Sequence, residues 1–328
     1  MKKAFITGIN GQDGSYLSEY LISLGYEVYG IVRRNSVSEN QQSRFSDDIR
    51  SKLHIFYGDL LDQSCLEKLL TDIQPDEIYN LAAQSHVRVS YDIPQFTAQT
   101  NAIGVLNILE AYKRACPQAK FYQASSSEMF GNSVDPDGYQ RETTPFSPVS
   151  PYGCSKVFAF NITKNYRNAF KLHICNGILF NHESPRRGSN FVTTKVIKTA
   201  IEIKHGLSNR LVLGNMDSFR DWGHSKDYVK AMHMIINNDV PDDFVVSTME
   251  THSVRQMVEY VFKKLNLDTE KYIFQDAKFM RSEELKYLKG DSSKIRNKLN
   301  WKPEYSFESL MDEMIEHWEN IIQKSNKS

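Results

Sequence analysis

A tyrosine and a lysine stand one helical turn apart in the segment SPYGCSK, residues 150–156. The serine can cap a helix that carries the proline in its first turn, so Tyr152 and Lys156 are expected on one face of that helix. Lowering a phenol pKa from about 10 to about 7, where it can act as a base, requires about 4 kcal/mol. An adjacent ammonium can supply part of this. Tyr260 and Lys264 have the same spacing, so spacing alone does not identify a catalytic pair.

Three glycines in the segment GINGQDG, residues 8–14, directly follow the first apolar run and precede an amphipathic stretch. Glycines at such a strand–helix junction allow close approach of a dinucleotide, and the helix N-terminus faces its pyrophosphate. The spacing GxxGxxG resembles that of the short-chain dehydrogenase/reductase superfamily. An ordinary turn can carry three glycines too, but the flanking strand and helix favour the dinucleotide site. The residues expected to form it are Gly8, Asn10, Gly11, Gln12, Asp13 and Gly14.

The end of the second apolar run carries Arg33 and Arg34, where an acidic residue would bond the ribose 2′-hydroxyl of NAD. Two guanidinium groups favour a 2′-phosphate and therefore NADP, with a solvated surface pair as the alternative interpretation. The third and fourth runs end where adenine and ribose would lie, and the residues there are Asp59, Leu60, Leu81, Ala82, Ala83, Gln84 and Ser85.

A hydroxyl and a carboxylate end the fifth apolar run, in the segment ASSSEMFG, residues 124–131. Ser126 and Glu128 would lie beside the nicotinamide, whose positive charge also favours ionisation of Tyr152. Simple hydride transfer needs no such acid, whereas removing a proton next to a ketone and expelling hydroxide from the neighbouring carbon does. A lone loop glutamate is more often solvated, but its combination with Tyr152 and the glycine loop favours an acid/base role.

Short apolar runs alternate with amphipathic stretches through the first half of the chain, which predicts a Rossmann-like α/β fold with a doubly wound parallel sheet. The expected strands are 4–7, 27–32, 53–57, 77–82, 120–125 and 175–180, and the expected helices include 66–73, 97–115 and 151–170, after a first helix that stops at Gly25. Later helices are expected at 191–205, 226–236, 253–265 and 307–323. We therefore expect an NADP-binding domain over 1–180, joined by a returning segment near 221–250, and a smaller, mainly helical substrate domain over 181–328.

Composition restricts the class of partner. The 328 residues are 40% hydrophobic, and 40 basic residues balance 40 acidic ones, which excludes a disordered or fibrous chain and gives no net field for nucleic acid or an anionic membrane. A small molecule is the expected partner. The four cysteines are widely spaced and show no metal-ligand pattern, so no metal is expected. With neither a signal peptide nor a membrane span apparent, we expect a cytoplasmic protein.

The sequence resembles the GDP-mannose 4,6-dehydratases, extended members of the same superfamily, from Lys3 to about Met314. The motifs that carry the resemblance are TGINGQDGSYL (7–17), YNLAAQSHV (79–87), FYQASSSEMFG (121–131), SPYGCSK (150–156), GILFNHESPRRG (177–188) and RDWGHSKDYV (220–229). The resemblance implies conversion of GDP-mannose to GDP-4-keto-6-deoxymannose by internal hydride transfer from C4 to C6 through bound NADP. It implies a hydro-lyase of deoxysugar biosynthesis.

By this resemblance, Tyr152 takes the O4 proton of the sugar, and Glu128 takes the C5 proton and helps Ser126 expel the C6 hydroxyl as water. Lys156 holds the cofactor ribose and lowers the tyrosine pKa. His182 and Arg187 match cofactor contacts. Substrate contacts match Ser85, Asn181, Val192, Lys195, Arg220, Arg281 and Glu284. The family commonly forms tetramers, a dimer of dimers in which the loop 33–45 reaches a neighbour's cofactor, so a homotetramer is expected ahead of a dimer.

Three departures from the family pattern leave the sugar open. Ser126 stands where the family usually has threonine, the segment 132–141 is slightly longer than usual, and Ser282 replaces a common proline. The extra room could admit GDP-manno-heptose, which has one more carbon beyond C6. An epimerase or 4-ketoreductase of the same fold would not need Glu128. A regulatory nucleotide-binding protein would not need Tyr152 or Lys156.

Overall fold

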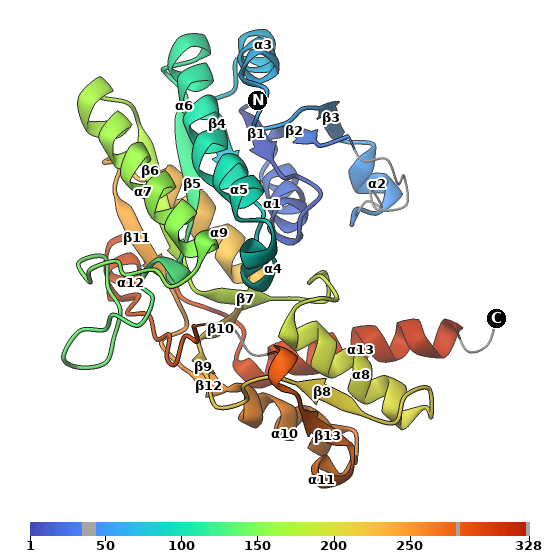
Figure 1. Ribbon diagram of the computed structural model, residues 1–328. Coiled ribbons are helices and arrows are strands. Elements are labelled where there is room, and N and C mark those ends of the chain that lie inside the picture. Colours follow the sequence, from blue (N-terminus) through green and yellow to red (C-terminus); the bar gives the residue numbers. More distant parts are fainter. Residues whose placement is uncertain (35–43, 280–282, 326–328) are drawn as a thin grey trace.

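The computed structural model describes residues 1–34, 44–279 and 283–325. Within them, seven parallel strands form the central sheet (Figure 1). Their spatial order is β3 (Leu53–Tyr57), β2 (Glu27–Val32), β1 (Lys3–Thr7), β4 (Glu77–Asn80), β5 (Lys120–Ser126), β6 (Ile174–Leu179) and β11 (Asp243–Val246). The strand order reverses direction between β1 and β4, which is the ligand-binding point of such sheets. The predicted doubly wound α/β fold is confirmed.

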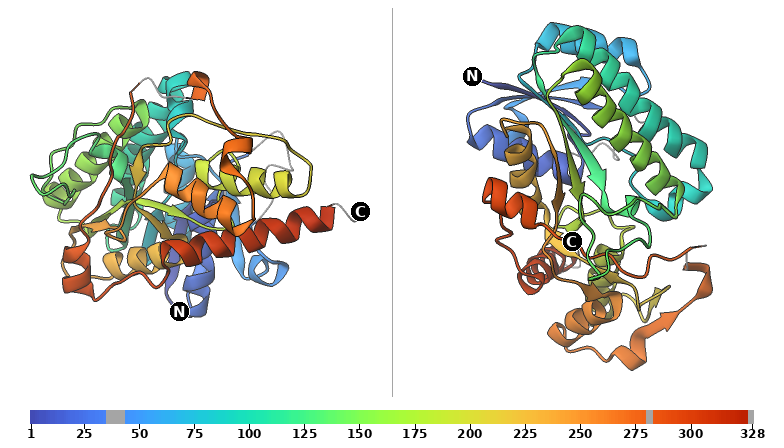
Figure 2. Two further views of the ribbon diagram at one scale, coloured as in Figure 1. Left: turned by 90° about the horizontal axis from the view of Figure 1, so that it is seen from below. Right: turned by 90° about the vertical axis from the view of Figure 1, so that its left-hand side faces the viewer.

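Helices cover both faces of the sheet, as Figure 2 shows in its right-hand view. One face packs against α3 (Gln63–Ile73), α6 (Gly104–Ala115) and α7 (Pro151–Phe170). The other packs against α1 (Gln12–Ser23), α9 (Ser225–Ile236) and α12 (Ser293–Leu299). Because both faces are covered, every residue of β4 and β6 is buried, including the polar residues Glu77, Asn80 and Asn176.

A buried row of polar side chains crosses the sheet near the carboxyl ends of its central strands. Thr7 donates to Asn80, 2.6 Å away, and Asn80 donates to Gln123 at 2.8 Å. The hydroxyl of Thr7 also accepts from the backbone N–H groups of residues 81 and 82 at 3.1 Å. The chain therefore turns around Thr7 after Asn80, and β4 ends two residues earlier than the sequence pattern predicts.

The helix predicted over 97–115 is interrupted. Its observed parts are α5 (Pro94–Ala98), a π-helical turn η2 (Gln99–Ile103) and α6. Within the turn, the side chain of Asn101 accepts from the Gln84 N–H at 2.8 Å and donates to the Gln84 carbonyl at 2.9 Å and to Ser155 at 3.2 Å. The wider turn thus lets Asn101 join the chain after β4 to α7.

The second half of the chain lies below the carboxyl ends of the strands (Figure 1). Its helices α8 (Val192–Lys204), α10 (Val254–Lys264), α11 (Thr269–Tyr272) and α13 (Phe307–Ser325) accompany three small strand pairs. These pairs are β7 (Asn181–Glu183) with β10 (Trp222–His224), β9 (Phe219–Arg220) with β12 (His252–Ser253), and β8 (Leu211–Leu213) with β13 (Ile273–Gln275). The short elements α2 (Asp47–Arg50), α4 (Val87–Asp92), η3 (Ser127–Met129) and η4 (Ala277–Phe279) complete the order.

A separate hydrophobic core unites this second half. It includes Ile197, Met257, Phe262 and Met314, all fully buried. By contrast, α9 packs on α1 and β11 extends the central sheet, so the segment around 225–246 returns to the first half.

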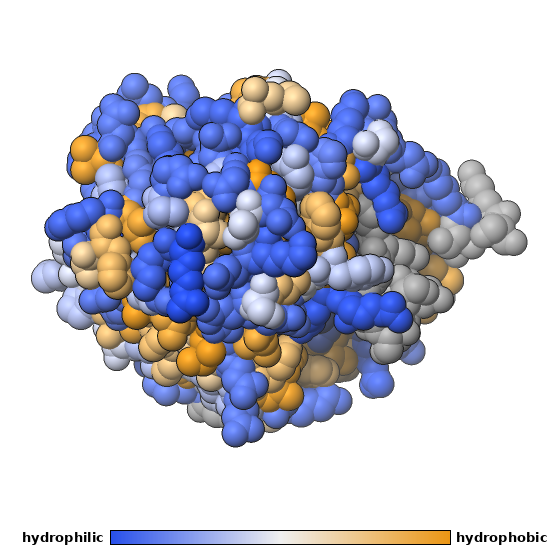
Figure 3. Space-filling view, turned by 90° about the horizontal axis from the view of Figure 1, so that it is seen from above, coloured by the Kyte–Doolittle hydropathy of each residue, from blue (hydrophilic) through white to orange (hydrophobic). Residues whose placement is uncertain are grey.

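The surface is mainly polar on the face seen in Figure 3, where hydrophobic residues form smaller groups between hydrophilic ones. No helix in the described part of the chain combines the length and the apolar character needed to cross a membrane. Within the same residues, no cluster of three or more histidine, cysteine or acidic side chains is placed to hold a metal ion. All four cysteines are free thiols.

Candidate active site

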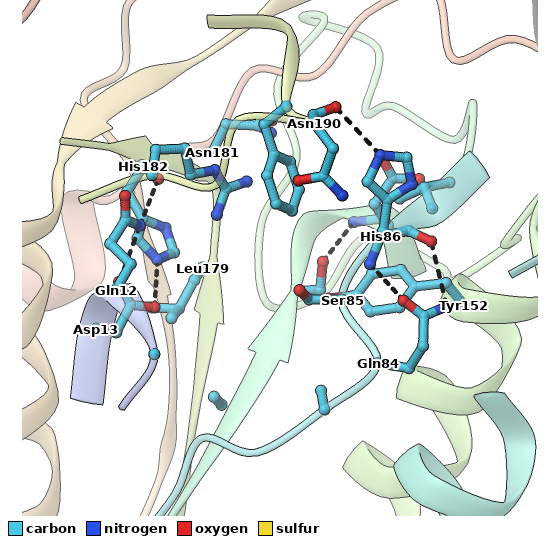
Figure 4. A pocket seen from close by; sticks show the side chains of 18 of the residues that line it. Gln12, Asp13, Gln84, Ser85, His86, Tyr152, Leu179, Asn181, His182 and Asn190 are labelled. Carbon is cyan, nitrogen blue, oxygen red and sulfur yellow. Dashed lines mark hydrogen bonds and ion pairs between the residues drawn. The ribbon is translucent and has the colours of Figure 1, made fainter. Parts of the chain in front are cut away.

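A cavity of about 730 Å³ opens where the carboxyl ends of β1, β4, β5 and β6 face the second half of the chain. Figure 4 shows two groups of side chains across it. Gln12, Asp13 and His182 lie on one side, and Ser85, His86 and Tyr152 lie on the other. The cavity therefore brings the glycine loop, the chain after β4 and the start of α7 to one place.

The glycine loop has the tight geometry that a dinucleotide requires. Gly8 adopts a positive φ of +71°, and the N–H of Gly11 donates to the Gly8 carbonyl at 2.9 Å. A Cβ at Gly14 would overlap that same carbonyl oxygen, so the loop and α1 pack too closely for a side chain. No side chain caps α1 at its N-terminus. This helix end therefore presents backbone N–H groups to the cavity, which fits a bound pyrophosphate.

An ion pair fixes the loop against β7. Asp13 lies 2.8 Å from Nε2 of His182, whose Nδ1 lies 2.7 Å from the Phe180 carbonyl. Burial by itself raises the pKa of Asp13, but the charge and hydrogen bond of His182 lower it overall. Burial opposes the charged form of His182, yet Asp13 raises its pKa overall. The imidazole also stacks on Tyr228, with ring centres 4.5 Å apart. Both partners thus favour the charged state.

Tyr152 begins α7 as the sequence pattern predicts. The Ser150 hydroxyl accepts from the Gly153 N–H at 3.0 Å, and proline occupies the first turn. Burial raises the pKa of Tyr152 to about 12, and Glu128 adds to this effect, whereas a hydrogen bond with Ser126 opposes it. The phenol, the Ser126 hydroxyl and the Glu128 carboxyl group all line the cavity. Because Ser126 and Glu128 both affect the pKa of Tyr152, the three groups form one cluster.

Lys156 is buried one turn further along α7. Its ammonium donates to the Ala124 carbonyl at 2.8 Å and lies 5.8 Å from the centre of the Tyr152 ring. Burial lowers the pKa of Lys156 to about 8. The groups that lower the pKa of Tyr152 here are Ser126 and Arg187, and burial outweighs them. The role expected of Lys156, lowering the phenol pKa when a cofactor is bound, stays a prediction.

The far end of the cavity carries basic and polar groups from the second half. Lys195 donates to the Val212 carbonyl at 2.7 Å and lies 4.1 Å from the centre of the Phe279 ring. Arg220 donates to the Leu285 carbonyl at 3.0 Å. Asn181 lines the cavity, and its side-chain oxygen is buried with no hydrogen-bond partner among the described residues. The ammonium of Lys195 and the guanidinium of Arg220 are donors that suit a diphosphate, and the Asn181 oxygen can accept from a nucleoside.

Almost every residue expected from the sequence lines this one cavity. The exceptions are Arg34, which is exposed outside it, and Arg281, which lies outside the described residues. Arg33 does line the cavity, with its guanidinium 5.6 Å from the centre of the Phe96 ring. The remaining expected residues in the lining include Asp59, Leu60, Leu81, Ala82, Ala83, Gln84, Arg187, Val192 and Glu284.

The sequence did not point to several residues of the lining. Thr100 has a buried hydroxyl without a partner among the described residues, and it reaches the cavity from the π-helical turn. His86 accepts from the Val89 N–H at 3.2 Å through Nδ1 and lies 3.3 Å from the Asn190 carbonyl through Nε2 (Figure 4). The Phe191 ring packs 3.6 Å from the Arg187 guanidinium. A sequence pattern predicts neither a π-turn nor contacts between distant loops.

Comparison with known proteins identifies the family. A profile of the GDP-mannose 4,6 dehydratase family matches residues 5–314. The chain belongs to this family. GDP-mannose 4,6 dehydratase of Cricetulus griseus is 46% identical over 343 residues, covering 96% of this chain and 91% of the relative. The enzyme of that name from Vibrio cholerae serotype O1 is 42% identical over 349 residues, covering 96% and 92%. The resemblance predicted from the motifs is confirmed.

Solved structures of lower identity share the fold of this dehydratase family member. A dTDP-glucose 4,6-dehydratase from Bacillus anthracis in complex with NAD matches with a TM-score of 0.84 at 22% identity, covering 98% of each chain. A UDP-glucose 4-epimerase from Thermotoga maritima with UDP-glucose also has a TM-score of 0.84 at 22% identity, covering 98% of this chain and 99% of that one. Because both dehydratases and epimerases share this architecture, the fold does not determine the reaction.

Proposed function

We propose that the protein is a nucleotide-sugar 4,6-dehydratase, a hydro-lyase that converts GDP-mannose to GDP-4-keto-6-deoxymannose and water. The observation that carries this proposal is the cluster of Tyr152, Ser126 and Glu128 in one cavity with the glycine loop. An oxidoreductase of the same fold needs the phenol and the cofactor site but has no step for a carboxyl group. Family membership and the carboxyl group together favour dehydration.

The chain's own groups divide the proton transfers between them. Tyr152 accepts the O4 proton of the sugar, and Glu128 accepts the C5 proton. Ser126 and Glu128 then assist departure of the C6 hydroxyl, which leaves as water with the proton that Glu128 took. The proton taken from O4 returns to the sugar at C5 when C6 is reduced. Lys156 orients the cofactor ribose. A bound nicotinamide dinucleotide supplies a hydride acceptor and donor within the site, so the overall conversion is redox-neutral.

The cofactor we propose is NADP. Arg33 at the end of β2 supports this choice, because a guanidinium there suits a 2′-phosphate and no acidic residue occupies that position. The tight packing at Gly8 and Gly14 and the uncapped start of α1 suit a pyrophosphate. His182 and Arg187 are proposed cofactor contacts that enter from the second half.

The nucleotide of the proposed substrate is guanosine diphosphate. Its contacts are Ser85, Asn181, Val192, Lys195, Arg220, Arg281 and Glu284, of which all but Arg281 lie in the described cavity. A second candidate substrate is GDP-manno-heptose, favoured by Ser126 in the lining, since serine has one methyl group fewer than threonine. The extra carbon of a heptose lies beyond C6, on the side where the Ser126 hydroxyl acts.

Incubation with each GDP-sugar, without added reductant, tests the function and the sugar together. We expect loss of one water from the sugar, detected by mass spectrometry, while total NADP stays constant. A product of unchanged mass would indicate an epimerase. In a parallel incubation of a GDP-4-keto sugar with NADPH, consumption of NADPH with a gain of two hydrogens would indicate a ketoreductase. Faster turnover of GDP-manno-heptose than of GDP-mannose would identify the heptose as the substrate.

Assembly and domain division remain proposals. We propose a homotetramer, for which residues 35–43 of the expected contact loop lie outside the described part of the chain. Light scattering of the purified protein would give its mass directly. We further propose a cofactor domain over 1–180 with the returning segment near 221–250, a substrate domain over the rest of 181–328, and a cytoplasmic location.

A further inference from the structure

The segment 284–291 links the substrate side of the cavity to the rest of the molecule. Glu284 lines the cavity, and the Leu285 carbonyl accepts from Arg220, which the proposed function assigns to the diphosphate. On one side the segment pairs with Phe219, whose N–H donates to the Lys286 carbonyl at 2.9 Å. The position of this segment therefore sets where Glu284 and Arg220 present their side chains.

The other side of the segment is held by the loop 132–141. The side chain of Asn132 donates to the Glu284 carbonyl at 3.3 Å and accepts from the Lys286 N–H at 3.1 Å. The fully buried Gln140 exchanges backbone hydrogen bonds of 2.9 Å with the Lys289 carbonyl and the Asp291 N–H. The loop thus holds the segment at both ends, through the Asn132 side chain and through an isolated β-bridge between Gln140 and Gly290.

Arg141 closes this loop on itself and on the segment. Its guanidinium forms two bonds with Asp137, at 2.9 and 2.6 Å, one with Asp135 at 2.9 Å, and one with Asp291 at 2.8 Å. Isolated surface ion pairs contribute little, but one planar donor shared by three carboxylates is a geometrically defined network. Without the guanidinium, three carboxylates would face one another. The side chains of Asp135, Asp137 and Asp291 would then move apart and release the segment.

The two ends of the long connection between Glu128 and Tyr152 are fixed by other contacts. Gly131, with φ of +59°, packs so closely on the Ser147 carbonyl that a Cβ would overlap it. Phe146 packs on Phe130 with ring centres 5.2 Å apart. At the other end the Ser150 hydroxyl caps α7. Loss of the Arg141 network should therefore displace the segment 284–291 more than the catalytic cluster.

We infer that Arg141 is a positioning residue for recognition of the substrate's nucleotide. It acts through Asp291 and the segment 284–291 on Glu284 and Arg220, and it touches neither substrate nor cofactor. This inference rests on the proposed function, because it assigns the nucleotide to that side of the cavity. It predicts that substrate affinity and turnover respond differently when the network is broken.

The experiment compares the wild type with Arg141→Gln, Arg141→Lys and a control, Arg114→Gln. Arg114 also faces two carboxylates, Glu67 and Glu110, each 3.6 Å away, and it lies outside the cavity lining. Calorimetry measures GDP binding to the NADP-loaded protein, fluorescence measures NADP binding, and steady-state assays give KM and kcat for GDP-mannose. Circular dichroism establishes that each variant is folded.

We expect Arg141→Gln to raise both the Kd for GDP and the KM by about tenfold, the loss of one charged hydrogen bond, while kcat changes by less than about threefold and the Kd for NADP stays the same. Arg141→Lys should give a Kd for GDP and a KM between those of the wild type and Arg141→Gln, because a lysine keeps the charge but not the fork geometry. Arg114→Gln should match the wild type.

Wild-type GDP affinity in folded Arg141→Gln, or a fall in kcat alone, would overturn the inference. If Arg141→Gln does not fold, Arg141→Lys decides by the same criterion. Failure of the wild type to bind GDP would instead reject the proposed function.

Discussion

The ammonium of Lys156 lies 5.8 Å from the centre of the Tyr152 ring and donates to the carbonyl of Ala124, at the end of β5. The lysine is therefore tied to the strand that carries Ser126, and the tyrosine is neutral at neutral pH, with its pKa raised by burial to about 12. Ionisation of the phenol must depend on positive charge brought into the cavity with the cofactor. Under the proposed function, Tyr152 therefore becomes a base only when the dinucleotide is bound.

Cofactor affinity should depend on pH through Lys156. Burial lowers the pKa of this lysine to about 8, and an anionic dinucleotide favours its charged form. Binding then raises the lysine pKa, so the favourable contribution is complete below about pH 8 and is lost as the pH rises above it. NADP titrations by fluorescence on both sides of this pH should show the decline. Lys156→Met should bind NADP weakly, and its affinity should show no such decline with pH. An unchanged pH profile in the variant would contradict this assignment.

Replacing Tyr152 by phenylalanine should remove turnover and leave the fold intact. The phenol takes part in a hydrogen bond with Ser126, and its loss removes the proton acceptor for O4. A positioned general base typically contributes a factor of about 100 or more, so kcat should fall by at least that much. NADP binding should change little. Product formation measured by mass spectrometry, with NADP titration as the control, checks both statements, and turnover near that of the wild type would exclude Tyr152 as the base.

Glu128→Gln should separate oxidation from elimination. The amide keeps the size of the side chain but cannot accept the C5 proton, so the sugar should stop at the 4-keto stage. Reduced nicotinamide should then accumulate in proportion to the enzyme, visible by its absorbance in a single turnover. The matched control is Glu142→Gln, which changes a partly buried carboxyl group outside the cavity lining. Full dehydratase activity in Glu128→Gln would remove the basis of the proposed reaction.

The two neighbouring arginines after β2 should differ in their effect on cofactor choice. Arg33 lines the cavity, whereas Arg34 does not. Arg33→Ala should weaken NADP binding by about tenfold or more, the value of a charge-assisted hydrogen bond, and should leave NAD binding unchanged. Arg34→Ala should behave as the wild type toward both. Parallel titrations with NADP and NAD decide the matter, and equal effects of the two variants would count against a 2′-phosphate contact at Arg33.

Asp221 should make the stability depend on pH. This carboxyl group is fully buried and accepts hydrogen bonds from the Thr248 N–H and hydroxyl and from the Met249 N–H. Burial nevertheless raises its pKa to about 7. The folded state therefore holds a proton that the unfolded state has lost above its pKa of about 3.8, so stability is highest below that value and falls as the pH rises to about 7.

The measurement compares the wild type with Asp221→Asn by urea unfolding between these two pH values. The free energy of unfolding of the wild type, minus that of Asp221→Asn, should fall by about 1.4 kcal/mol for each unit by which the pH rises, because one proton is released on unfolding. The amide does not titrate, so the variant supplies the reference for all other groups. A difference that stays constant with pH would show that Asp221 is ionised throughout.

The sequence predicted six of the seven strands of the central sheet, because strands buried on both faces are rich in apolar residues, but it did not predict β11. For β2, β3 and α7 the expected bounds agree with the observed ones. The strand pairs of the second half were not predicted, since strands of two or three residues, such as β9 and β12, leave no period to detect. The π-turn in the helix expected over 97–115 arises from contacts of Asn101 with distant residues, which local pattern does not contain.

The sequence predicted best those residues of the cavity lining that directly follow a strand. The glycine loop, Ser126 and Glu128 occupy such positions, whereas Tyr152 begins α7, and the topology brings all of them to one edge. The ion pair of Asp13 with His182 joins residues far apart in the chain, so its geometry was not predictable. Arg33 and Arg34 were indistinguishable in sequence, because the direction of each side chain depends on how the chain leaves β2.

The row formed by Thr7, Asn80 and Gln123 has a consequence for how the chemistry is aligned. Slippage of β1, β4 or β5 by a single residue would bury unmatched amides and hydroxyls, a much larger penalty than shifting one apolar side chain past another. The hydrogen bonds therefore fix the register of β1, β4 and β5, and with it the relative positions of the three loops that follow these strands. None of these three side chains lines the cavity, so they align the loops of the site without contacting the space where ligands would bind.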